Sequence, residues 1–309
     1  MVVPWRREAD PRRFLQASAA SLAILALVTV SGAFVRLTGS GLGCENWPRC
    51  GDTPLPARDF HALVEFGNRV VALVGILAAL ATWLVARRVP GLPRRVRLTA
   101  FGAVLGTLAQ IPLGGVTVLL DLHPVAVMSH FFLAFVVLAL AVFTVREARD
   151  RTRGLVRRPA PRAERAAAAL LGLACVVAIV TGAVATASGP HPGSDLQVER
   201  LGLGIEGTVY VHVRATAVFG IALALLAVSA WRRRHAAPDA LRLLCALLCA
   251  LVVQMAVGEI QYRNALPWGL VLAHVALASG IWLLTVAFAH AAWRRPVDAL
   301  APAATTLPT

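Results

Sequence analysis

The sequence predicts an all-α membrane protein with eight transmembrane helices, arranged as two pseudo-symmetric four-helix bundles. Three observations lead to this prediction: long apolar blocks, alternating arginine-rich connections, and an internal repeat. Of the 309 residues, 58% are hydrophobic and the mean hydropathy is +0.71, whereas soluble domains are about half apolar. The apolar residues form eight blocks, each near the ~20 residues that cross a hydrocarbon core. These blocks cover roughly residues 14–36, 61–86, 98–120, 125–145, 164–187, 207–231, 239–260 and 267–292.

The formal charge of +14 comes with a distribution that indicates topology. All 30 basic residues are arginines, and 23 of them lie at the N-terminus, in three alternate connections and just after the last block. The other connections hold few arginines, which is the pattern of the positive-inside rule. We therefore expect a multi-pass protein of the cell membrane with both termini in the cytoplasm and a lipid bilayer around it. The same distribution argues against binding to nucleic acid.

The chain also repeats itself, with an offset of 144 residues. This offset aligns Gln110, Gly114 and His130 with Gln254, Gly258 and His274, and it aligns Asn68 with His212. Near the start of each half, Val30-Ser31-Gly32-Ala33 resembles Val180-Thr181-Gly182-Ala183. We divide the chain into an N-terminal half (1–150), a cytoplasmic linker (151–163), a C-terminal half (164–295) and a disordered cytoplasmic tail (296–309). Both halves start and end inside, so the repeats should be parallel.

Two of the five cysteines lie in the first outer connection, where the compartment permits disulfides. Cys44 and Cys50 can therefore close a short loop, either as a structural staple or as a redox-active pair. The other three cysteines lie inside apolar blocks, where they behave as small apolar residues.

Ionisable residues inside the apolar blocks are the main indication of function, because such residues are costly in a membrane. They lie near the outer ends of the even-numbered helices, so that the repeat-related positions form one layer: Glu65, Arg69, His130, His212 and His274. His61 lies one turn further out and is either a solvent-side histidine or an alternative ligand. Zinc would need more nitrogen, sulfur or carboxylate ligands than this layer offers. Heme needs one or two axial imidazoles and an apolar slot between helices. The histidines of this layer and the apolar helices that carry them fit that need.

The two halves differ in this layer. The C-terminal half has His212 and His274, a candidate bis-imidazole pair for an electron-transfer heme. The N-terminal half has His130, but Asn68 takes the place of a second histidine, and Glu65 lies one turn before Asn68. This half resembles a site with an open coordination position and a nearby carboxylate, as oxidative chemistry requires.

Three arginines near the outer layer need partners. Arg36, Arg69 and Arg214 lie at or just inside the predicted helix ends. They can pair with heme propionates, or they can extend toward lipid headgroups.

Several segments resemble the heme A synthase family. RLTGSGLGCENWPRC (36–50) is similar to the first outer loop of that family, and VEFGNR (64–69) to its glutamate motif. SHFFLAF (129–135) and AHVALA (273–278) are similar to its histidine segments. The likeness runs over all eight helices, and the first-loop motif is its most specific part.

The resemblance implies an oxidoreductase of heme A biosynthesis and cytochrome oxidase assembly. It would oxidise a ring methyl of heme O to a formyl group through two successive hydroxylations. It further implies that His212 and His274 hold a heme b cofactor, that heme O binds at His130 near Asn68 and Arg69, and that Glu65 is catalytic. Cys44 and Cys50 match a loop cysteine pair that can form a disulfide. The implied partners are the farnesyltransferase that makes heme O and oxidase assembly factors, with a homo-oligomer left open.

The chain departs from the family pattern where Asn68-Arg69 stands in place of His-Arg, which favours a five-coordinate substrate heme. The alternative function is a diheme membrane cytochrome b that passes electrons to or from quinone. Such a protein would need two complete histidine pairs. A heme-delivery protein is a further alternative, and it would need no glutamate.

Overall fold

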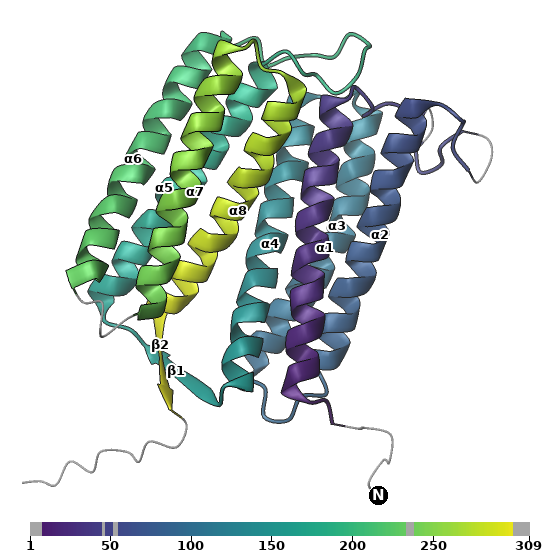
Figure 1. The fold of residues 1–309 in the computed structure, drawn as a ribbon. Coiled ribbons are helices and arrows are strands. Elements are labelled where there is room, and N and C mark those ends of the chain that lie inside the picture. The colour runs from purple at the N-terminus through teal and green to yellow at the C-terminus, as the bar shows by residue number, and fades with distance from the viewer. Residues whose placement is uncertain (1–7, 45–46, 52–54, 233–237, 299–309) are drawn as a thin grey trace, which may run out of the picture.

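A computed structural model describes residues 8–44, 47–51, 55–232 and 238–298 of the 309-residue chain. It contains eight long helices whose bounds follow the predicted apolar blocks closely (Figure 1). They are α1 (Pro11–Leu37), α2 (Phe60–Ala86), α3 (Arg94–Leu119), α4 (Pro124–Thr152), α5 (Arg162–Ser188), α6 (Ile205–Arg232), α7 (Pro238–Arg263) and α8 (Trp268–Trp293). All eight are long and apolar enough to cross a membrane. The predicted all-α multi-pass membrane fold is therefore confirmed.

The helix starts have local causes in the sequence. Asp10 precedes Pro11 and accepts a hydrogen bond from the Arg12 amide, and Asp59 accepts from the His61 and Ala62 amides. Side-chain oxygens at this position satisfy amides that have no partner inside the helix. The cap at Asp59 also fixes where α2 begins, and hence the depth of the polar residues one and two turns later.

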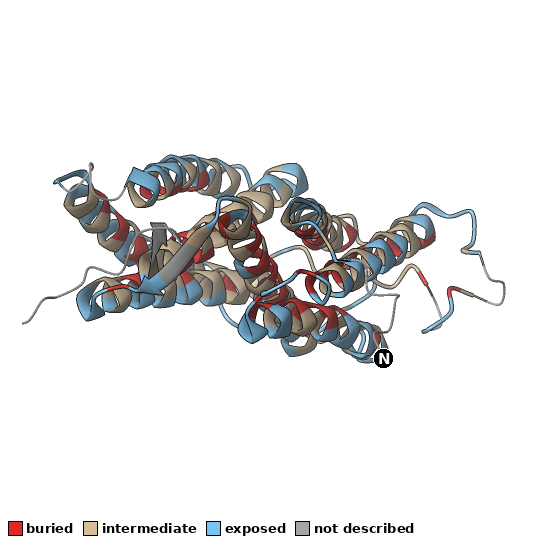
Figure 2. Ribbon diagram, turned by 90° about the horizontal axis from the view of Figure 1, so that it is seen from below, coloured by how far each residue is buried: buried red, intermediate tan, exposed pale blue. Residues whose placement is uncertain are grey.

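Apolar side chains cover the outer faces of the helices, as a lipid environment requires. Figure 2 shows the buried residues where helices face one another and the exposed ones around the outside. Many of the exposed residues are leucine and valine, such as Leu77, Leu105, Leu173 and Leu225.

The same pattern of helix contacts occurs among the first four helices and among the last four. In the N-terminal half, α1 packs on α2 and α4, and α3 packs on the same two helices. In the C-terminal half, α5 packs on α6 and α8, and α7 packs on the same two helices. The pseudo-symmetry of two separate bundles stays a prediction.

The halves meet where α8 contacts α1 and α4. The Trp282 indole nitrogen of α8 donates to the Phe135 carbonyl of α4 at 2.8 Å. Near the inner end, buried His290 of α8 lies 3.3 Å from Glu147 of α4, which also accepts from Arg95 of α3. Polar contacts therefore tie the halves together at two depths.

The main departures from the sequence-based expectation lie at the end of the molecule that the sequence predicts to be cytoplasmic, called the inner side here. Helix α4 continues to Thr152, seven residues past the predicted block, because the chain after residue 145 still favours helix. Within the predicted linker, β1 (Leu155–Pro159) pairs antiparallel with β2 (Arg294–Asp298), below the ends of α4 and α8 (Figure 1). Residues 296–298 of the predicted tail thus belong to a strand, and residues 299–309 lie outside the described residues.

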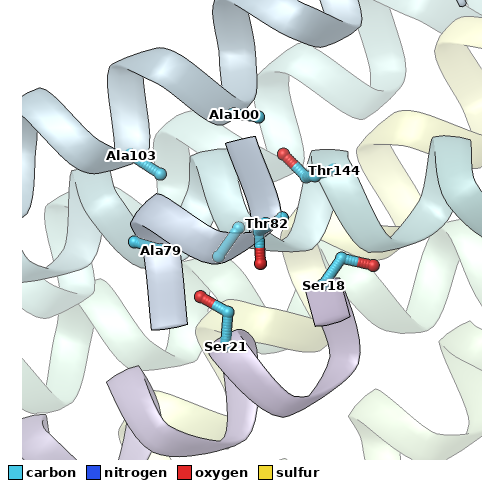
Figure 3. Close-up of a pocket in the computed structure, with 8 residues that line it drawn as sticks. Ser18, Ser21, Ala79, Thr82, Ala100, Ala103 and Thr144 are labelled. Carbon is cyan, nitrogen blue, oxygen red and sulfur yellow. The ribbon is translucent and has the colours of Figure 1, made fainter. Parts of the chain in front are cut away.

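The inner part of the N-terminal half encloses a small cavity lined by hydroxyl and alanine side chains (Figure 3). Ser18, Ser21, Thr82 and Thr144 of α1, α2 and α4 gather around it, and the Thr82 hydroxyl donates to the Ala17 carbonyl at 3.0 Å. The cavity has about 10 Å³ of space, enough for about one water molecule. It is far too small for a porphyrin, and the candidate site lies at the outer ends of the helices instead.

Candidate functional site

The outer layer of the C-terminal half brings two predicted histidines face to face. The ring centres of His212 on α6 and His274 on α8 lie 6.3 Å apart, and the ring planes are inclined by 73°. Two imidazoles that bind one metal ion from opposite sides, each at about 2 Å, have ring centres about 6 Å apart. The spacing of the pair therefore fits two axial ligands of one iron.

Each of these rings rests on a glycine of a neighbouring helix. A Cβ atom added to Gly182 of α5 would lie 2.9 Å from His212 Cε1, and one added to Gly258 of α7 would lie 3.1 Å from His274 Cε1. The Thr181 hydroxyl lies 3.2 Å from His212 Nδ1, which fixes that ring and leaves Nε2 for a ligand. His274 Nδ1 is buried without a hydrogen-bond partner. An orphaned imidazole nitrogen and two glycine cradles are features of a site that receives a further group.

The N-terminal half repeats half of this arrangement. His130 of α4 rests on Gly114 of α3, where an added Cβ would lie 3.2 Å from its Cε1. Its Nδ1 is buried without a partner, and its backbone carbonyl accepts from Gln110 Nε2 at 3.3 Å. His130 therefore stands in the same surroundings as its repeat partner His274.

Asn68 replaces the second histidine and keeps its contact. The Ser31 hydroxyl of α1 donates to Asn68 Oδ1 at 2.7 Å, just as Thr181 pairs with His212 in the other half. This pair of equivalent hydrogen bonds was missed from the sequence, although the Ser31-Gly32 and Thr181-Gly182 repeat gave the signal. An amide is a poor iron ligand, so the N-terminal half offers one imidazole where the C-terminal half offers two.

Glu65 and Arg69 on α2 hold the first outer loop. Glu65 is buried, its Oε2 accepts from the Cys44 amide at 2.8 Å, and its Oε1 accepts from Arg69 at 2.5 Å. Arg69 also donates to the Pro48 and Arg49 carbonyls at 3.0 and 3.1 Å. The predicted Cys44–Cys50 disulfide is present in this loop. The acidic side chain predicted to be catalytic thus lies at the base of the disulfide loop.

The second outer loop (residues 189–204) is joined to the first. Arg36 of α1 donates to the Thr186 carbonyl at 2.9 Å and the His191 carbonyl at 3.1 Å. Arg200 also donates to the Thr186 carbonyl, and its partial burial lowers the pKa of its guanidinium. Ser40 and Ser194 form an isolated β-bridge between the loops. Arg36 therefore bonds backbone oxygens that link the two halves.

Two other side chains have local partners in the outer layer. Arg214 of α6 lies over the ring of Tyr210, with its guanidinium carbon 3.1 Å from the ring centre. His61 Nδ1 lies 3.0 Å from the Ser40 hydroxyl, and its Nε2 lies 3.8 Å from the exposed Asp195. His61 is thus engaged with the outer loops on the solvent side. Among the described residues, no three His, Cys, Asp or Glu side chains come together as a metal cluster.

These features define a class: a multi-pass membrane protein with two related histidine sites, one paired and one half-complete. Residues 16–190 match the model of the COX15-CtaA family, described as cytochrome oxidase assembly protein. The chain belongs to this family.

Named relatives support the assignment. The chain is 27% identical over 319 residues to the heme A synthase of Shewanella oneidensis, covering 89% of this chain and 95% of that protein. It is 35% identical over 144 residues to the heme A synthase of Symbiobacterium thermophilum, where the match covers 46% of this chain and less than half (47%) of the relative. It is 27% identical over 150 residues to the heme A synthase COX15 of Bos taurus, covering 45% and 35% of the two chains.

Proposed function

We propose that this protein is a heme A synthase, an oxidoreductase that converts the ring methyl of heme O to a formyl group. The observation that carries the proposal is the pairing of a two-histidine site with a one-histidine site in related surroundings. Relatives that bear the name heme A synthase support the same reaction. Two successive hydroxylations would give a hydroxymethyl group and then a hydrated aldehyde, which loses water.

The C-terminal half is the proposed cofactor site. His212 and His274 would hold the iron of heme b, with Gly182 and Gly258 leaving room for the two imidazole rings. Heme b, when bound, supplies one-electron transfer. The Thr181 hydroxyl sets the orientation of His212 by its contact with Nδ1, as partners of the second nitrogen do for metal-binding histidines.

The N-terminal half is the proposed substrate site. His130 would hold the iron of heme O from one side, while Asn68, fixed by Ser31, leaves the other side open. Glu65 would hold or move a proton near the reacting methyl, because it is the buried acid of this layer and Arg69 is within hydrogen-bond reach. Arg36, Arg69 and Arg214 are the candidate propionate contacts on the outer side.

Location and partners follow from topology and chemistry. The arginine-rich connections support cytoplasmic termini in the cell membrane. The substrate must come from a farnesyltransferase that produces heme O, and the product serves cytochrome oxidase assembly. A homo-oligomer is compatible with the apolar outer faces.

A diheme cytochrome b is the competing function. It would need a second bis-histidine site, and Asn68 occupies the position where that ligand would stand. The N-terminal half also has the buried Glu65 and a disulfide loop over its outer end, which an electron carrier does not require.

The deciding experiment is expression in a host that makes heme O but no heme A. Membrane hemes are extracted and separated by chromatography with mass detection. A formyl-bearing heme, or its hydroxymethyl precursor, is the expected product. Heme b that copurifies while heme O stays unmodified, with the native reductant present, would instead support the electron carrier.

A further inference from the structure

The first outer loop places the indole of Trp47 on α3, next to the glycine that backs His130. The Trp47 indole lies on Gly115 of α3, where an added Cβ would come within 2.6 Å of Cε2, 2.7 Å of Cζ2 and 2.8 Å of Cδ2. Contacts below 3.0 Å mean that any side chain at residue 115 would displace the indole. The position of the Trp47 indole therefore requires a glycine at residue 115.

Gly115 directly follows Gly114, the glycine on which His130 rests. Two rings thus lie on consecutive residues of α3: the proposed iron ligand from α4, and the indole from the outer loop. Because residues along a helix are 1.5 Å apart in rise, the two rings occupy nearly the same depth. Consecutive residues of an α-helix are also about 100° apart around its axis, so the two rings lie on adjoining faces of α3 at a similar depth.

The loop that carries Trp47 is held on both sides of it. The Cys44 amide donates to Glu65 before it, and the Pro48 and Arg49 carbonyls accept from Arg69 after it. The Cys44–Cys50 disulfide closes the same segment. With so many anchors on α2, the indole has a fixed position rather than that of a loose loop side chain.

The corresponding positions of the C-terminal half, among the residues that the structure describes, differ from those around Trp47. The residue aligned with Gly115 is Glu259, which is exposed and pairs with Arg263 at 2.5 Å. The loop at 189–204 contains neither tryptophan nor cysteine. The tryptophan at the outer end of this half, Trp268 at the start of α8, instead packs edge-on against Phe34 of α1, with ring centres 6.0 Å apart.

We propose that Trp47 is a substrate-positioning residue that closes the outer edge of the N-terminal site and packs its indole on the porphyrin of heme O. The proposal rests on the proposed function. A flat indole buries a large apolar area and stacks well on an aromatic macrocycle. It would keep water from the reacting edge and hold the ring methyl in register, while Glu65 and Arg69 hold the indole.

The test compares Trp47→Ala, Trp47→Phe and Gly115→Ala with wild type in detergent-purified protein that retains C-terminal heme b. Gly172→Ala on α5 is the matched control, because an added Cβ there meets nothing within 4 Å. The dissociation constant for heme O is measured by absorbance titration, and kcat and KM by product analysis.

We expect Trp47→Ala to raise both the dissociation constant and KM for heme O by roughly tenfold or more, with heme b content unchanged. Trp47→Phe should recover most of the loss. Gly115→Ala should reproduce the loss although the indole is still present, and Gly172→Ala should match wild type.

Wild-type affinity and KM in Trp47→Ala would overturn the proposal and leave the heme A synthase function intact. Loss of heme b from Trp47→Ala would also overturn it, since the indole would then support the fold as a whole. Wild-type protein that binds heme O without making heme A would remove the proposed function, while the titration series would still decide the role of Trp47.

Discussion

The outer layer of the C-terminal half ends in two facing histidines, whereas the same layer of the N-terminal half has one histidine and an asparagine. The supporting residues are alike: Thr181 contacts His212 as Ser31 contacts Asn68. Gly258 backs His274 as Gly114 backs His130. Related surroundings therefore carry two imidazoles in one half and one in the other.

The second difference between the halves lies between this layer of residues and the outer loops. The N-terminal half has Glu65 and Arg69 on α2, and both are bonded to the disulfide loop. The aligned positions of α6 are Val209 and Val213. In the C-terminal half, the two facing histidines have valines at the positions aligned with Glu65 and Arg69. In the N-terminal half, the single histidine has a buried acid and a disulfide loop nearby. This contrast is what a permanent electron carrier and a reactive site would each require.

The largest expected effect comes from breaking the complete pair. His274→Ala or His212→Ala removes one of two imidazoles 6.3 Å apart, and we expect purified protein to lose its low-spin heme b signal almost completely. Heme extraction and absorption spectroscopy measure this.

His123→Ala is the control for the histidine variants, because His123 lies on the outer surface beside Glu199 at 3.6 Å. It should retain full heme b content. Full heme b in both ligand variants would show that the C-terminal pair does not hold the cofactor.

The second-largest expected effect tests whether Glu65 takes part in the reaction or only anchors the first outer loop. In Glu65→Gln the amide oxygen can still accept from the Cys44 amide, while the charge opposite Arg69 and the exchangeable proton are lost. A proton-transfer role predicts a fall in kcat by about 100-fold or more. The measurement is the rate of formyl-heme formation at saturating heme O.

Loop integrity must be followed alongside the rate. The Cys44–Cys50 bond is checked by mass spectrometry after alkylation, and it should be intact in Glu65→Gln. A normal rate with an intact disulfide would make Glu65 an anchor of the loop and no more.

Much of the fold could be predicted because helices that cross a membrane can be recognised from their apolar composition. The apolar blocks located all eight helices within a few residues at most ends, since a hydrocarbon core sets their length. The end of α4 was placed too early because arginine and glutamate beyond residue 145 ended the apolar signal but not the helix. The β1–β2 pair joins residues about 140 apart, and neither strand has a pattern strong enough to reveal it.

The candidate site was partly predictable because the internal repeat relates residues of the two halves. The 144-residue repeat identified the histidines and Asn68 as one layer, and the facing of His212 and His274 agrees with it. The contacts of Arg36 and of Trp47 depend on how two loops fold over the helix ends. Loop conformation leaves little periodic signal in a single sequence, so those contacts needed coordinates.

The smallest expected effect tests whether the histidine ring alone makes the two halves differ in their tolerance of an added methyl group at a glycine. Gly182→Ala on α5 would place a methyl 2.9 Å from His212 Cε1, so the ring must shift. Gly32→Ala on α1 is its repeat partner, and its added methyl meets nothing within 4 Å because Asn68 is shorter than a histidine. Alanine also favours a helix over glycine by about 0.5–1 kcal/mol.

We therefore expect opposite signs from the two matched substitutions. Gly182→Ala should loosen heme b several-fold, measured by transfer of heme to an excess of apomyoglobin, while Gly32→Ala should leave heme b retention unchanged and raise the melting temperature slightly. Adding Asn68→His to Gly32→Ala should cancel that gain, since the new imidazole would meet the methyl as His212 does. Equal effects of the two glycine substitutions would mean that helix packing common to both halves decides the outcome, and that the contact with His212 does not.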